Sequence, residues 1–76
     1  MKRPTHPMSD EVAQALQAED LRDQYDARPW YQRNDYLGWI DRAKRSDTRI
    51  RRLRQMLDEL RAGDIYMKMA WRPKNR

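Results

Sequence analysis

The residues from 47 to 62 carry the repeat that most constrains what this chain can fold into. Aliphatic side chains recur there at three- and four-residue steps, with one methionine beside them: Ile50, Leu53, Met56, Leu57 and Leu60. Such spacing places apolar side chains on one face of an α-helix. Gly63 follows at the position where a left-handed residue commonly ends a helix. The repeat therefore predicts a helix over about 47–62 that must bury one face against other elements.

Two earlier segments show the same period. Val12 and Leu16 open an apolar series after Ser9 or Asp10, either of which can cap a helix. The five-residue step from Leu16 to Leu21 does not keep a single stripe. We therefore expect this helix to break or kink near 18–20, so that the first helix is split in two.

Pro29 separates the first helical segment from the next one, since the residue before a proline disfavours the helical conformation. Between 30 and 45, Tyr36, Trp39 and Ile40 fall on one face. Ser46 or Asp47 is the next predicted cap. The chain is therefore predicted to be an all-α, three-helix bundle.

The two ends of the chain lack helical periodicity. Residues 1–8 contain two prolines and are predicted to be a flexible N-terminal arm. The helical domain then spans 9–63. In the segment 64–76, Ile65, Met67, Met69 and Trp71 alternate, which is typical of an extended tail. A lone strand is not stable by itself, so we expect this tail to dock on the helices.

The small set of reactive residues excludes several classes of site. The 76 residues include no cysteine and one histidine, His6, which lies between two prolines. Disulfides and thiolate metal sites are therefore excluded, and we expect no metal and no cofactor. The sequence also has no glycine-rich phosphate loop and no histidine beside a nucleophile. These observations predict a protein that is not an enzyme.

Charge is concentrated in the middle of the chain. Residues 42–54 hold seven basic residues against one acidic residue, a net charge of +6, whereas residues 1–41 carry −3. The candidate polyanion- or partner-binding residues in this block are Lys44, Arg45, Arg51, Arg52 and Arg54. Basic clusters of this kind bind phosphates in a salt-sensitive manner. The acidic first half of the same chain is the competing partner for these arginines.

Arg49 is interpreted differently from the rest of the block. It falls within roughly 40° of the centre of the apolar stripe of its helix. An arginine at that edge more often pairs with a carboxylate of its own fold than with a ligand. The candidate partners are Asp26, Asp35 and Asp41.

The stretch 32–53 resembles the conserved segment of the YdeI/OmpD-associated, bacteriocin-protection family of bacterial proteins. The matching positions are Tyr36, Trp39, Ile40, Ala43, Lys44, Arg45, Thr48, Arg49, Arg52 and Leu53. Among these, the resemblance implies structural roles for Tyr36, Trp39, Ile40, Thr48 and Arg49. It covers about residues 10–63 and implies a helical module with no enzymatic mechanism. Ser46 stands where a proline is common in the family.

These observations predict a non-enzymatic interaction module that is linked to envelope or antimicrobial-peptide stress and binds an unidentified protein partner. The alternative is a nucleic-acid-binding domain that uses the basic block 42–54. No apolar run approaches the roughly 20 residues of a membrane span, and no signal peptide is recognisable, so we expect a cytoplasmic protein. Because the core is small, we expect a monomer or a weak homo-oligomer.

Overall fold

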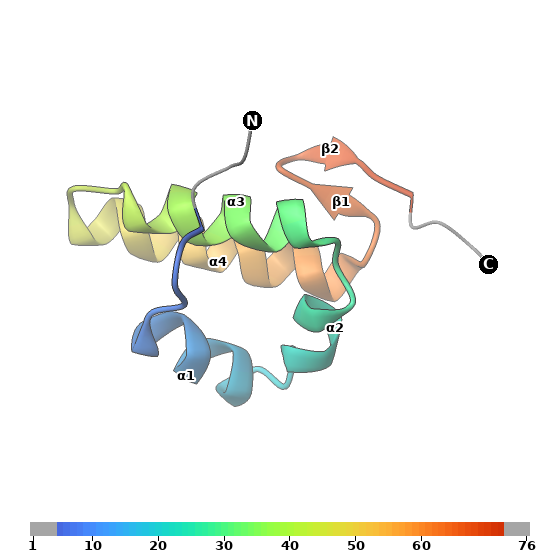
Figure 1. The fold of residues 1–76 in the computed structure, drawn as a ribbon, viewed down its shortest axis with the longest axis horizontal. Helices are drawn as coiled ribbons and strands as arrows, with labels where there is room; N and C mark the ends of the chain where they lie inside the picture. The colour runs from blue at the N-terminus through green and yellow to red at the C-terminus, as the bar shows by residue number, and fades with distance from the viewer. Residues whose placement is uncertain (1–4, 73–76) are drawn as a thin grey trace.

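The structure is a computed structural model that describes residues 5–72. Over these residues the chain forms four helices followed by a two-stranded antiparallel hairpin (Figure 1). The elements are α1 Asp10–Ala18, α2 Arg22–Asp26, α3 Trp30–Asp41, α4 Ser46–Ala62, β1 Ile65–Tyr66 and β2 Met69–Ala70. The predicted small helical bundle is confirmed, and its first helix is split into α1 and α2.

The break between α1 and α2 has a local cause. Asp20 has a φ of 58°, in the left-handed region, which aspartate tolerates better than most residues. This residue turns the chain so that Leu16 and Leu21, which do not share a helical stripe, both face the core. At the start of α1, the Ser9 hydroxyl oxygen accepts a hydrogen bond from the amide of Val12 at 3.3 Å, as a helix cap does.

The helices α3 and α4 lie side by side, and α1 and α2 together pack on one side of this pair (Figure 1). Their apolar faces meet in a single core. Its buried members are Val12, Leu16, Leu21, Tyr25, Tyr36, Leu37, Ile40, Leu53, Met56, Leu57 and Leu60. Gly63, with a φ of 86°, ends α4 in the predicted left-handed conformation.

One end of the predicted stripe on α4 is not buried. The four buried members are Leu53, Met56, Leu57 and Leu60. Ile50 is 57% exposed. With about 100° per residue, Ile50 lies roughly 70° from the centre of the four buried positions, whereas Arg49 lies only about 30° from it. Arg49 therefore takes the inward position of that turn, and the prediction that Ile50 is buried was wrong.

The tail folds back on itself. Ile65 pairs with Ala70 and Tyr66 with Met69, so β1 and β2 form a tight hairpin. The extended alternation predicted for this segment ends at Met67 and Lys68, which have φ values of 50° and 64° and form the turn. Tyr66 and Met67 pack against the helical core. The segment therefore docks on the helices, as expected, but as a hairpin.

The N-terminal segment contacts α3. The His6 amide donates a hydrogen bond to the Asn34 side-chain oxygen at 2.8 Å. A β-carbon on Gly38 would lie 2.6 Å from the His6 imidazole Nε2, so glycine is what allows this close approach. Gly38 is buried beneath this contact. Residues 1–4 of the predicted flexible arm and residues 73–76 of the predicted tail lie outside the described range.

Candidate interaction surfaces

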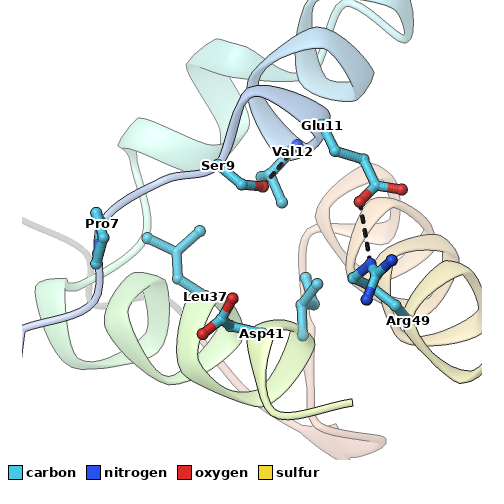
Figure 2. A pocket seen from close by; sticks show the side chains of 8 residues that line it. Pro7, Ser9, Glu11, Val12, Leu37, Asp41 and Arg49 are labelled. Carbon is cyan, nitrogen blue, oxygen red and sulfur yellow. Dashed lines mark hydrogen bonds and ion pairs between the residues drawn. The ribbon is translucent and has the colours of Figure 1, made fainter. Parts of the chain in front are cut away.

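Two arginines of the basic block form ion pairs with glutamates at the two ends of the α1 region. The Arg49 Nε lies 3.3 Å from a Glu11 carboxylate oxygen (Figure 2), and the Arg54 guanidinium lies 3.6 Å from Glu19. Arg61, in the last turn of α4, also pairs with Glu19. The acidic first half of the chain is therefore the partner of these arginines. Arg49 pairs with Glu11, and not with any of the three aspartates that the sequence suggested.

Arg52 is also used by the fold. Its Nη1 donates a hydrogen bond of 2.6 Å to the Trp39 carbonyl oxygen, and its guanidinium lies over the Trp39 ring at 5.3 Å. The last carbonyls of a helix lack partners within that helix. Arg52 satisfies one of them at the end of α3, while Trp39, half-buried, lies beneath the guanidinium. This position leaves Arg52 less free to bind a phosphate.

The remaining candidates gather around the connection between α3 and α4. Lys44, Arg45, Ile50 and Arg51 are exposed, and we call this set the basic end. Arg45 forms an ion pair of 3.1 Å with Asp47, in which both side chains are mostly exposed. Over residues 5–72, neither Lys44 nor Arg51 has an ion-pair partner. Three of the five predicted binding cations are thus exposed within a short stretch of sequence that also holds the exposed Ile50.

The residues matched to the family motif occupy different environments. Tyr36 and Ile40 are buried in the core, and Trp39 lies beneath Arg52. Thr48 lies in the first turn of α4, where its amide donates a hydrogen bond to the Asp47 carboxylate at 2.8 Å. Arg49 links α4 to α1 through Glu11. All of these positions except Thr48 contribute to contacts between helices, and the five do not converge on one site.

A pocket of about 220 Å³ lies where the N-terminal segment, α1, α3 and α4 meet (Figure 2). Its apolar wall includes Val12 and Leu37, and its polar groups include Asp41 and the Glu11–Arg49 pair. Carboxylates and a guanidinium that face each other across so small a space largely neutralise one another. Within residues 5–72, no group of three histidine, cysteine, aspartate or glutamate side chains could hold a metal ion.

A second polar cluster lies under the hairpin and was not predicted. Glu59 is only 5% exposed, and its carboxylate accepts four hydrogen bonds. The donors are the Tyr36 hydroxyl, the Gln55 amide group at 3.0 Å, and the backbone amides of Met67 and Lys68, both at 2.8 Å. Glu59 therefore fixes the hairpin turn to α4.

Arg28, only 4% exposed, extends this cluster. Its guanidinium donates hydrogen bonds to the Glu59 carbonyl oxygen at 2.8 Å and to the Gln32 side-chain oxygen at 3.0 Å. The Trp71 ring covers the same guanidinium at 4.6 Å. Burial, reinforced by the hydrogen bond to Glu59, raises the pKa of the Tyr36 hydroxyl well above its usual value. The hydroxyl therefore remains a donor to the carboxylate over the whole neutral range.

Few features of the sequence indicate this cluster. Glu59 stands beside Leu60 at the edge of the apolar stripe of α4, where glutamates are usually solvated. Its burial depends on the hairpin, a contact with residues eight and nine positions away that the helical period does not encode.

The family model described as "Bacteriocin-protection, YdeI or OmpD-Associated" matches residues 5–63. No curated protein and no solved structure matches the chain significantly. Among the described residues, none of the helices is both long and apolar enough to cross a membrane. The match includes the basic end, Glu59 and Arg28, but stops before the hairpin.

Proposed function

Because this chain belongs to the bacteriocin-protection, YdeI or OmpD-associated family, we propose that it is a non-enzymatic protein-interaction module of bacterial envelope or antimicrobial-peptide stress physiology. We propose further that it acts in the cytoplasm and binds its partner through the basic end. The observation that carries this proposal is the 57% exposure of Ile50, which in the sequence lies between Lys44 and Arg51, two exposed cations without an ion-pair partner among residues 5–72.

The chemistry of the basic end defines the kind of partner. Contact with another apolar surface removes an exposed isoleucine from water, which is favourable. Lys44 and Arg51, which precede and follow Ile50 in the sequence, favour carboxylates and disfavour cations. The partner segment that fits is therefore an apolar side chain flanked by aspartates or glutamates. The neutralised arginines of α4 would hold the helix in place without entering the contact.

Site-specific photocrosslinking in the host cell tests this proposal. A photoreactive amino acid at Ile50 should give a discrete adduct with one partner protein, and Arg51→Glu should remove that adduct. The matched control is the same amino acid at Gln14, an exposed position of α1. Equal adduct patterns at the two positions, or an adduct unaffected by Arg51→Glu, would contradict the proposal.

Nucleic acid is the alternative partner, and the cation arrangement allows a sharper test of it. Arg52 and Arg54 serve the fold, so a Lys44→Glu/Arg51→Glu variant removes exposed charge without breaking an ion pair within residues 5–72. If the chain binds DNA or RNA, affinity measured by fluorescence anisotropy falls steeply with salt, and this variant loses it. Absence of binding at low salt would leave the protein partner as the ligand of the basic end.

A further inference from the structure

We propose that the surface beneath the hairpin is a second binding site, for a tight turn of a partner polypeptide, and that residues 64–72 occupy it as a displaceable ligand within the chain. We call this surface the turn site and define it by Arg28, Tyr36 and Glu59. It lies near the end of α4 opposite to the basic end. Its occupant is recognised as a turn with two consecutive backbone amides, followed by an aromatic side chain.

The contacts that hold the turn are made by its backbone. Each oxygen of the Glu59 carboxylate accepts one amide of the turn, from Met67 and from Lys68, at 2.8 Å. Successive amides in left-handed or turn conformations form a concave site for an anion. A carboxylate that binds such a turn selects the geometry of the turn, so another segment with the same geometry can take its place.

The segment that occupies the site depends on its contacts with the helices, where Tyr66 and Met67 pack against the core, and not on its own strand pairing. Each strand of the hairpin has two residues, and an isolated two-stranded hairpin is marginally stable at best in water. Met69 is 59% exposed, and Ala70 is exposed as well. Next to the Trp71 ring, a space of about 150 Å³ lined by Ala27 and Leu60 remains open. A larger side chain in a partner turn would fill this space.

The turn also has residues that do not suit it. Both Met67 and Lys68 adopt left-handed conformations, which non-glycine residues avoid because the β-carbon crowds the following carbonyl. A turn with glycine or asparagine at these positions would bind the same carboxylate without that cost. A competing segment therefore has an intrinsic advantage over the chain's own tail.

The extent of the family match supports the same conclusion. Arg28, Tyr36 and Glu59 all lie within the matched residues 5–63, whereas every residue of the hairpin lies beyond them. The residues that define the turn site therefore lie inside the matched segment, and the segment that occupies the site lies outside it. The turn site is independent of the proposed role of the basic end, because it consists of other residues and is tested with purified protein.

The test compares three forms of the full chain. Lys68→Pro should release the tail, because proline removes one of the two amides and cannot adopt the φ of 64° found there. Lys68→Gly should tighten the tail, because glycine adopts that φ without strain. The probe is a synthetic peptide of residues 64–72 with the Lys68→Gly change. It is titrated into ¹⁵N-labelled protein and followed by NMR.

The expected order of affinity for the peptide is Lys68→Pro tightest, the unchanged chain next and Lys68→Gly weakest. The Lys68→Pro form should bind at least about tenfold tighter than the unchanged chain, since it lacks a competitor at millimolar effective concentration. The shifts should centre on the Arg28 and Gln32 side-chain signals. Adding Glu59→Gln to the Lys68→Pro form should abolish binding.

Equal binding by the three forms would overturn the proposal. So would an absence of binding by Lys68→Pro when circular dichroism shows its helices intact, or binding that survives Glu59→Gln. If Lys68→Pro loses its helical signal, Trp71→Ala takes its place, because it removes the contact with Arg28 and keeps both turn amides. Its peptide affinity must then exceed that of the unchanged chain, or the proposal fails.

Discussion

Replacing Glu59 by glutamine tests how the hairpin is attached to the helices. The side chain keeps its shape, but one oxygen becomes an NH₂ group, which donates and cannot accept. In the protein, one oxygen accepts from the Tyr36 hydroxyl and the Met67 amide, and the other from Gln55 and the Lys68 amide. Whichever oxygen is replaced, two donors face the new NH₂.

The expected loss of stability follows from counting the donors that can adapt. The Tyr36 hydroxyl can rotate, and the Gln55 amide can flip, so that each accepts a hydrogen bond. A backbone amide cannot, so one of the two turn amides loses its partner in either orientation. An unsatisfied buried donor costs about 1–3 kcal/mol, and the remaining bonds lose their charge-assisted strength. We expect the free energy of unfolding to fall by about 2–4 kcal/mol in total.

That loss is a large fraction of the stability of a chain of this length, about 4–11 kcal/mol at 0.05–0.15 kcal/mol per residue. Urea denaturation followed by circular dichroism measures it, and hydrogen exchange at Met67 and Lys68 locates it. Asp58→Asn is the control, because Asp58 is exposed beside Glu59 and should change stability by less than about 0.5 kcal/mol. A loss for Glu59→Gln no larger than that of Asp58→Asn would refute the argument.

Three further predictions concern the rest of the fold. Gly38→Ala should displace the His6 imidazole and so remove the protection of the His6 amide from hydrogen exchange, and retained protection would contradict this. The free energy of unfolding should change by less than about 1 kcal/mol, because alanine favours the helix. The free energy of unfolding should fall above about pH 10, because the unfolded chain then releases protons that the folded chain keeps on Tyr36 and Tyr25. The slope should be at most about 1.4 kcal/mol per pH unit for each tyrosine. Denaturation at each pH should show a smaller slope for Tyr36→Phe, and an unchanged slope would refute the role of Tyr36. Glu19→Gln should lower the free energy of unfolding by less than about 1 kcal/mol, because its ion pairs with Arg54 and Arg61 are exposed. Denaturation in 1 M salt should show a smaller loss than in low salt, and a loss independent of salt would argue against ion pairing.

The helices could be predicted from the sequence because their signals are local. The five-residue step from Leu16 to Leu21 located the break between α1 and α2, and Gly63 located the end of α4. The positions that differ depend on contacts distant in the chain. Ile50 is exposed although it belongs to the apolar repeat, and its neighbour Arg49 pairs with Glu11, 38 residues earlier. No periodicity within α4 distinguishes these two outcomes.

The candidate sites divide in the same way. Charge segregation along the sequence offered the acidic first half as one partner of the basic block, and Arg49 and Arg54 do pair with it. It did not identify which cations remain exposed, because Arg52 is used by a backbone carbonyl and Arg54 by Glu19. The cluster around Glu59 was missed altogether, since each of its members has an ordinary neighbourhood in the sequence. Only the folding back of the tail brings backbone amides to that carboxylate.

The way the turn is held also affects how its sequence can evolve. Glu59 receives backbone amides, which every residue except proline supplies, so the side chain at position 68 is restricted only by the left-handed φ of 64° there. Selection that keeps the tail in place therefore acts mainly on the helix that receives it. Tails with the same role in other members of the family would share little sequence, and the recognisable trace would be a glutamate at the edge of the last helix, four residues before its closing glycine.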